Sequence, residues 1–185
     1  MTQPQQSVIR HVIDPKALAG ILGCGRRAVL DELLEAERQS FLGGHTDLGP
    51  VLERAVLEGV PFPGLDREDV AHGHAAMRLA YASVSRREPF TNSTVAWPDW
   101  QTGVRLADAV LRDEARTLLH FLRDGRALFG ARPVGFGSVY AFLSPAETKT
   151  LARALAPVAA GPVRDAVALC ARLRAGLFVH LPFAG

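Results

Sequence analysis

Two tryptophans lie close together in a polar stretch that contains a proline. Trp97 and Trp100 flank Pro98-Asp99 in the segment VAWPDWQ, which we predict to be a loop outside any helix. Indole rings on loops often anchor a protein partner or stack on a ligand, because each offers a large apolar surface and one N–H donor. The alternative is that both rings fold over the core. The pair is our first candidate binding site.

His120 is the histidine best placed for chemistry. It lies near the end of a predicted helix, four residues from both Arg116 and Asp124. A histidine there can interact favourably with the helix dipole as a C-terminal cap. It could also act as a general base if a pocket opens at the glycine-rich turn that follows. Tyr140, on a predicted strand beyond that turn, is the second residue that we assign to such a pocket.

Other motifs argue against metal, phosphate and known catalytic chemistry. His72 and His74 stand two apart on a predicted helix, so their side chains point about 200° away from each other and cannot chelate one ion. The segment Gly135-Phe136-Gly137 lacks the third glycine and the lysine of a phosphate-binding loop. No nucleophile elbow, HExxH, EF-hand or kinase signature is present. We expect no metal, no cofactor and no catalytic constellation.

Composition is that of an ordinary globular domain. The chain has 185 residues, 48% of them hydrophobic and 22% charged, which is enough for one domain with a sizeable core. No apolar run approaches a membrane span, and the first residues do not read as a secretory signal, so we expect a cytoplasmic protein. A net charge of +2 is too small to indicate nucleic-acid binding. Cys24 and Cys170 fit no paired motif and are read as small apolar residues.

Local signals place the elements of the first half of the chain. Residues 1–6 are polar and expected to be frayed. Asp14-Pro15 reads as an N-cap followed by a helix-starting proline. Alternation and helical periodicity then predict a strand at 7–13 and helices at 15–22, 26–40, from 50 onwards, and at 66–87.

The second half holds the clearest local signal, Ser144-Pro145-Ala146-Glu147, which is a full capping box. Before it we predict a long helix at 103–123, capped by Thr102, and a strand at 134–143 whose glycines indicate either a bulge or the close approach of another backbone. The buried stripe of that helix is Val104, Ala107, Leu111, Leu118 and Leu122, and on its outer face Asp108 is expected to pair with Arg112. Helices at 145–156 and from 162, then a final strand at 177–183, complete the chain.

This order of elements predicts an α+β fold. Strands at the start, late middle and end, with helices massed between them, favour a small, mostly antiparallel sheet covered by several helices. We expect residues 7–185 to form one domain, with two long helices in the middle of the chain and the first and last strands as neighbours in the sheet.

The stretch from Leu118 to Leu155 resembles a known family. Matching positions are Leu119, His120, Phe121, Leu122, Gly125, Pro133, Val134, Gly135, Phe136, Gly137, Tyr140, Leu143, Ser144, Pro145 and Glu147. They resemble the YfbM-like family of bacterial domains, which has no established function. The middle and the C-terminus are also similar to a related, uncharacterised actinobacterial family. Arg116 and Thr117 stand where the YfbM-like pattern has a tryptophan and a histidine. The resemblance implies a fold rather than an activity.

Three hypotheses for function follow. The first is a small cytoplasmic protein-binding module, of immunity or regulatory type, whose partner is another protein rather than nucleic acid or a membrane; compact α+β domains without catalytic motifs suit that task. The second is an enzyme or small-molecule binder with a pocket between the sheet and the long helices, using His120, Tyr140 and a tryptophan. The third is a homodimer formed through the edges of the sheet.

Overall fold

A computed structural model describes residues 7–39, 48–59, 70–84, 93–126, 134–135 and 138–182. Its strands are β1 (Ser7–Ile13), β2 (Ser93–Ala96), β3 (Val134–Gly135), β4 (Ser138–Leu143) and β5 (Gly176–Pro182). Its helices are α1 (Pro15–Ala19), α2 (Arg27–Arg38), α3 (Gly49–Glu53), α4 (Val70–Ala82), α5 (Trp97–Asp108), α6 (Asp113–Asp124), α7 (Pro145–Leu155) and α8 (Pro162–Leu173), with a π-helical turn, η1 (Arg54–Glu58), directly after α3.

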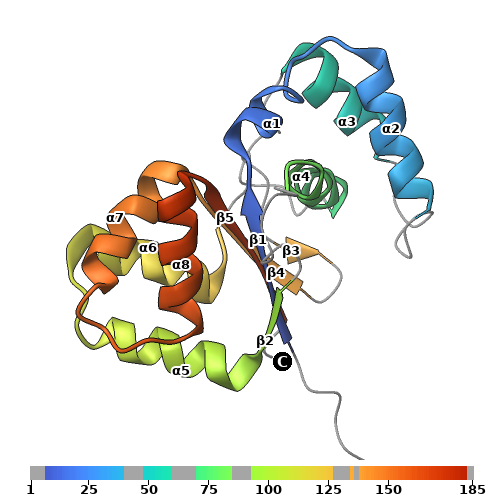
Figure 1. The fold of residues 1–185 in the computed structure, drawn as a ribbon. Coiled ribbons are helices and arrows are strands. Elements are labelled where there is room, and N and C mark those ends of the chain that lie inside the picture. The colour runs from blue at the N-terminus through green and yellow to red at the C-terminus, as the bar shows by residue number, and fades with distance from the viewer. Residues whose placement is uncertain are drawn as a thin grey trace, which may run out of the picture.

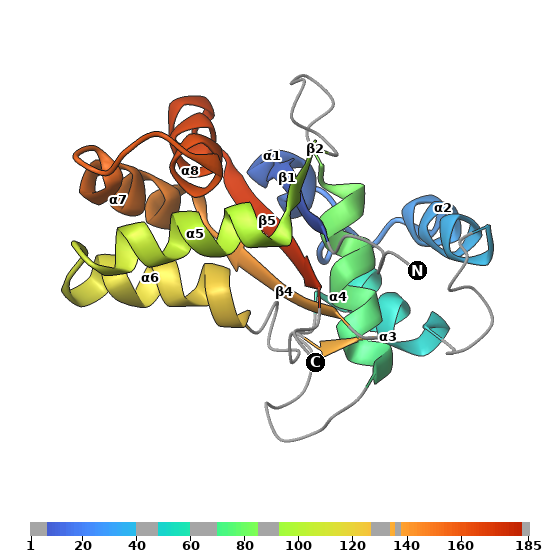
Figure 2. The same ribbon diagram turned by 90° about the horizontal axis from the view of Figure 1, so that it is seen from below.

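One antiparallel sheet separates two groups of helices. The strand order is β2-β1-β5-β4-β3, so the first and last strands of the chain are central neighbours, as predicted. Helices α5–α8 cover one face and α1–α4 the other (Figure 1), and the view from below shows the same division (Figure 2). The α+β fold class is confirmed. Because β1, β4 and β5 are covered on both faces, most of their side chains are apolar and buried on either face, with Arg10 and His11 of β1 as buried polar exceptions.

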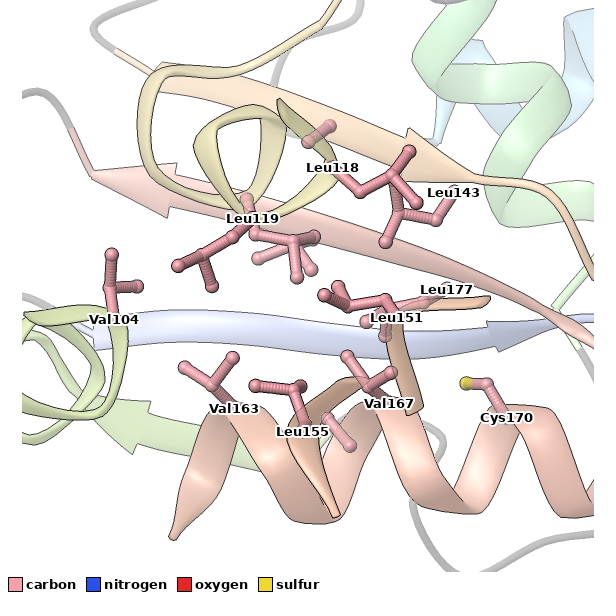
Figure 3. Packing of buried hydrophobic residues seen from close by; sticks show 14 of the residues in the cluster. Val104, Leu118, Leu119, Leu143, Leu151, Leu155, Val163, Val167, Cys170 and Leu177 are labelled. Carbon is pink, nitrogen blue, oxygen red and sulfur yellow. The ribbon is translucent and has the colours of Figure 1, made fainter. Parts of the chain in front are cut away.

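Each face of the sheet has its own core. On the α5–α8 side, the apolar side chains of α5, α6, α7 and α8 meet those of β1, β4 and β5. Figure 3 shows the centre of this cluster, including Val104, Leu118, Leu119, Leu143, Leu151, Leu155, Val163, Val167, Cys170 and Leu177. On the α1–α4 side, Tyr140 and Phe178 pack against α4 and the other helices of the first half. Cys170 is fully buried, as predicted, and burial raises the pKa of its thiol to about 12.

Predicted helix starts are confirmed where a side chain caps the backbone. The Asp14 carboxylate accepts hydrogen bonds from the backbone N–H groups of Lys16 and Ala17 at the start of α1. At the start of α7, the Ser144 hydroxyl accepts from the Glu147 N–H, and the Glu147 carboxylate accepts from the Ser144 N–H. These contacts involve residues three or fewer apart, so the sequence alone carries the signal.

The structure corrects three predicted elements. Trp97 and Trp100 lie in the first turn of α5 rather than in a loop, because Pro98 takes a position in that turn where no N–H is needed. The helix predicted at 103–123 is two helices, α5 and α6, which turn back on each other between Asp108 and Asp113. The strand predicted at 134–143 is a hairpin, in which Gly135 pairs with Ser138.

Some predictions fall outside the described residues. They are the frayed segment 1–6, the first residues of the helix predicted at 66–87, the side chains of His72 and His74, and the positions 136 and 137 between β3 and β4.

Candidate ligand-binding cleft

The two tryptophans have different surroundings. Trp100 is fully buried, and its indole Nε1 donates a hydrogen bond to the carbonyl of Leu122 on α6 over 3.1 Å. Trp97 is half-buried and packs against the same core. A hollow of about 340 Å³ lies beside both rings and is also lined by Arg105, Arg123 and other residues of α5 and α6. Trp100 therefore joins α5 to α6, and only Trp97 keeps surface for a partner.

His120 belongs to a polar cluster that links the same two helices. The Asp108 carboxylate on α5 accepts from His120 Nε2 over 2.8 Å and from Arg116 Nε and Nη2 over 2.8 and 3.2 Å. An ionised carboxylate only accepts, so Nε2 carries the proton in this contact. The Arg116 hydrogen bonds, followed by that of His120, lower the pKa of Asp108. The pair expected between Asp108 and Arg112 is wrong: after the turn, Arg116 and His120 reach Asp108 instead.

Tyr140 lies on the opposite face of the sheet from His120. Its side chain packs in the core beneath α4, with the Phe178 ring centroid 6.0 Å away, whereas α6 covers the other face. Alternation along β4 produces this separation, since Ala141 and not Tyr140 faces α6. Burial raises the pKa of Tyr140. The predicted set of His120, Tyr140 and a tryptophan is therefore not one site.

A larger cleft lies between the sheet and α5 and α8. Its volume is about 680 Å³. We call it the Arg10 cleft. Its lining comes from β1 and β2, from one face of α5, from the end of α7 and its connection to α8, and from the first turn of α8. The lining residues are Arg10, Val95, Asp99, Thr102, Gly103, Leu106, Ala107, Leu155, Val158, Ala159, Ala160, Gly161, Pro162, Val163, Arg164 and Asp165. The lining is mostly apolar, with few charged groups.

Arg10 is the unusual residue of this cleft. Only 9% of its surface is exposed, yet it forms no ion pair with any described residue. Its Nη1 donates to the carbonyl of Pro162 over 3.1 Å, while its Nε is buried without a partner. Burial lowers the pKa of the Arg10 guanidinium, and the negative charge of Asp165 opposes that shift. A buried cation with so few partners is costly unless something else compensates it.

The first turn of α8 faces the same cleft. Gly161 precedes the helix and offers no side chain to cap it, and Pro162 occupies the first turn. The first N–H groups of a helix have no partner within the helix and carry partial positive charge. Arg10 and the start of α8 therefore place positive potential at one spot. The cleft can hold a molecule that is mostly apolar and brings hydrogen-bond acceptors to that spot.

Arg10 is not among the site residues predicted from the sequence, although the sequence carries one signal of it. In SVIRHVI, the alternation of β1 places Arg10 between Val8 and Val12 on one face, and both valines are buried. A charged residue in the middle of a buried stripe is a sign of function or of a specific partner. The sequence does not show that α8 begins beside Arg10, because Arg10 and Pro162 are 152 residues apart and meet only in the folded chain.

A second buried polar group lies on the α4 face. His11 is 1% exposed, and neither ring nitrogen has a hydrogen-bond partner. Its ring packs edge-on to Tyr81 and stacks near Phe178, with centroid distances of 4.9 and 5.8 Å. Burial, and then the nearby His180, lowers the pKa of His11 to about 4. His11 is thus a neutral, packed aromatic ring in the folded protein.

Comparisons with known proteins returned nothing: a scan of protein-family models, a search of curated proteins and a search of solved structures each gave no match. The resemblance to the YfbM-like family stays a prediction. Among the described residues, no helix is long and apolar enough to cross a membrane. No group of three or more histidines, cysteines or acidic residues in that same part of the chain is placed to hold a metal ion.

Proposed function

We propose that this protein binds a small organic molecule in the Arg10 cleft. The observation that carries the proposal is the cleft itself, about 680 Å³ with a mainly apolar lining and a few polar groups. Binding sites for small molecules typically measure about 300–1,000 Å³ and have that kind of lining. This is the small-molecule alternative of the sequence analysis, with the site at β1, α5 and α8 in place of the surroundings of His120.

Apolar side chains at the rim support the same proposal. Leu106 on α5 lines the cleft and is 53% exposed. A ligand seated in the cleft would cover it. Burial of apolar surface of this kind contributes about 25 cal/mol for each Å² removed from water.

A blocking variant tests the proposal. A Cβ built at Gly161 meets no atom within 4 Å, and the residue's φ of 171° is extended backbone that any residue adopts. Gly161→Trp should therefore fold normally and fill the cleft. Ala28→Trp, on an exposed position of α2 behind the other face of the sheet, is the matched control.

The assay is a thermal-shift screen of a metabolite library, followed by calorimetry on each hit. We expect at least one compound that binds the wild type and Ala28→Trp equally and loses binding to Gly161→Trp. A screen without any such compound, or hits that bind all three proteins alike, would contradict ligand binding in this cleft.

We propose recognition of a protein partner as a second candidate function, and one observation favours it. Leu106 on α5 and Val110 in the turn directly after α5 are 53% and 54% exposed, and they stand four residues apart as two exposed apolar side chains. Leu106→Ser/Val110→Ser should then abolish a specific interaction in a pull-down while leaving thermal stability unchanged. Light scattering on the wild type at several concentrations tests the homodimer. Identical pull-downs from the wild type and from the double variant would count against recognition of a protein partner through these side chains.

A further inference from the structure

We propose that the molecule bound in the Arg10 cleft is an organic monoanion, a carboxylate with an apolar body, whose head group pairs with Arg10 at the start of α8. The inference rests on the proposed function and names the class of ligand.

The charge on Arg10 lacks a counter-charge in direct contact. Of the three guanidinium nitrogens, only Nη1 has a hydrogen-bond partner among the described residues, and that partner is the neutral carbonyl of Pro162. The residue as a whole is 91% buried, and its Nε is fully shielded from water. A carboxylate in the cleft would supply the missing charge and accept hydrogen bonds in the planar geometry that guanidinium groups favour.

The start of α8 adds a second positive contribution. α8 is a helix of 12 residues whose N-cap, Gly161, makes no side-chain hydrogen bond to the first turn. Arg10 contacts this turn directly, through Pro162. The Arg10 cation and the partial positive charge at the N-terminus of α8 repel each other. An anion placed between them is attracted by both. Asp165 in the same first turn offsets part of this positive charge. It forms no ion pair with Arg10 among the described residues, so the guanidinium still favours a negatively charged ligand.

The other charges of the cleft limit the ligand to one negative charge. Asp99 and Asp165 line the cleft beside Arg10 and Arg164. Arg164 donates from Nη1 to the neutral Val158 carbonyl over 2.5 Å and keeps its charge, so the two arginines and two aspartates of the lining balance. Asp165 is the largest electrostatic contribution that acts against the burial of Arg10. A dianion such as a phosphate monoester would meet about twice the repulsion from these carboxylates that a monoanionic carboxylate meets.

The apolar part of the ligand has a defined place. From Arg10 the lining continues along Leu106 and Ala107 of α5 and along Val158, Ala159 and Ala160 of the connection between α7 and α8. Gly103 lies at a close contact between α5 and α8, because a Cβ there would stand 3.1 Å from Val163 Cγ2. The cleft is thus closed at the contact between the helices, and the chain or ring of the ligand extends over the alanines.

Four probes that share one tail and differ only in the head group test the inference. They are octanoate, octan-1-ol, octylammonium and octyl phosphate, each titrated into the full-length wild type by calorimetry below its critical micelle concentration. We expect octanoate to bind about 10- to 100-fold more tightly than octan-1-ol, which is the range expected for a charge-assisted hydrogen bond. Octylammonium and octyl phosphate should bind more weakly than octanoate.

A variant of Arg10 separates the head group from the tail. Arg10→Met keeps an unbranched, flexible side chain, although a shorter one, and removes the charge, a change that buried sites often tolerate. It should bind octanoate and octan-1-ol about equally, whereas Arg172→Met, on the exposed last turn of α8, should behave like the wild type. The head-group series on the wild type alone decides the matter if Arg10→Met does not fold.

The outcomes distinguish this inference from the proposed function. Equal binding of octanoate and octan-1-ol, lost in Gly161→Trp, would overturn the anion and leave the cleft as a binding site. If octyl phosphate bound more tightly than octanoate, the claim that the ligand carries a single negative charge would be wrong. Binding of none of the four probes, with a library compound still bound in the cleft, would also overturn the inference. The absence of any cleft ligand would overturn both proposals.

Discussion

His11 makes the stability of this protein depend on pH in a way that can be calculated. Its imidazole is almost fully buried, and its pKa is lowered from 6.5 to about 4, chiefly by burial. The groups around it are Tyr81 on α4 and Phe178 and His180 on β5; Tyr81 Oη and His180 Nδ1 are 3.5 Å apart. None of these neighbours offers a negative charge that would stabilise an imidazolium.

The sign and size of the change in folding free energy with pH follow from proton linkage. As the pH falls below 6.5, the unfolded chain protonates His11 while the folded protein does not, so the unfolded state gains stability. With pKa values of 6.5 unfolded and about 4 folded, His11 alone costs about 2 kcal/mol of folding free energy between pH 7 and pH 5. The cost rises to about 3 kcal/mol by pH 4, and His180, whose pKa is also lowered by burial, adds to it.

Comparison with a variant isolates the contribution of His11. His11→Phe keeps an aromatic ring between Tyr81 and Phe178 but cannot titrate. Urea unfolding of both proteins at pH 7, 6 and 5 should show the wild type losing about 2 kcal/mol more than the variant over that range. Carboxylates elsewhere affect both proteins equally and cancel. A difference that stays constant with pH would refute the reasoning, since His11 would then titrate alike in the folded and unfolded states.

Three further predictions concern stability, each measured by urea unfolding. Gly59→Ala should cost about 1–2 kcal/mol or more, because φ is +67° and the new Cβ would stand 3.1 Å from Gly23 Cα; no loss would mean that this contact is not formed. Ser144→Ala should cost about 1 kcal/mol by removing the cap of α7, and an unchanged midpoint would contradict the capping box. Trp100→Phe should cost about 1–3 kcal/mol, since the Leu122 carbonyl loses its donor, and a similar loss in the half-buried Trp97→Phe would contradict that assignment.

The features predicted best from the sequence are those that depend on residues close together in the chain, such as helix caps. Asp14-Pro15 and the Ser144 capping box start helices through contacts across one turn, and the structure has both. Apolar alternation in β1 and β5 also requires no knowledge of the fold, and the two strands lie side by side. The stripe Val104, Ala107, Leu111, Leu118 and Leu122 is buried throughout, although the helix that was expected to carry it is broken.

That break shows what local patterns do not contain. No glycine or proline stands between Asp108 and Asp113, so nothing in the sequence marks the turn. Its cause is tertiary: Leu111 is 3% exposed in the core, and Asp113 adopts a φ of +49°, which aspartate tolerates better than most residues. Arg116 and His120 then reach Asp108 across the two helices.

The candidate site was missed for a related reason. Arg10 could be recognised from the sequence as a charge within a buried stripe, but its surroundings are supplied by α5 and α8, far along the chain. His120 and Tyr140 were grouped because they lie near each other in sequence across a turn. The sheet separates them, since Tyr140 packs beneath α4 and His120 lies on α6 on the other side.

The most direct test of the Arg10 cleft is a two-dimensional NMR titration of the isotope-labelled protein with octanoate. The proposal predicts that the backbone amides of Val163 and Arg164 and the side-chain Nε–H of Arg10 shift together, with one dissociation constant, while signals of α2 stay fixed. Shifts centred on Trp97 or His120 instead, or no shifts at all up to the solubility limit of octanoate, would contradict an anion-binding cleft at Arg10.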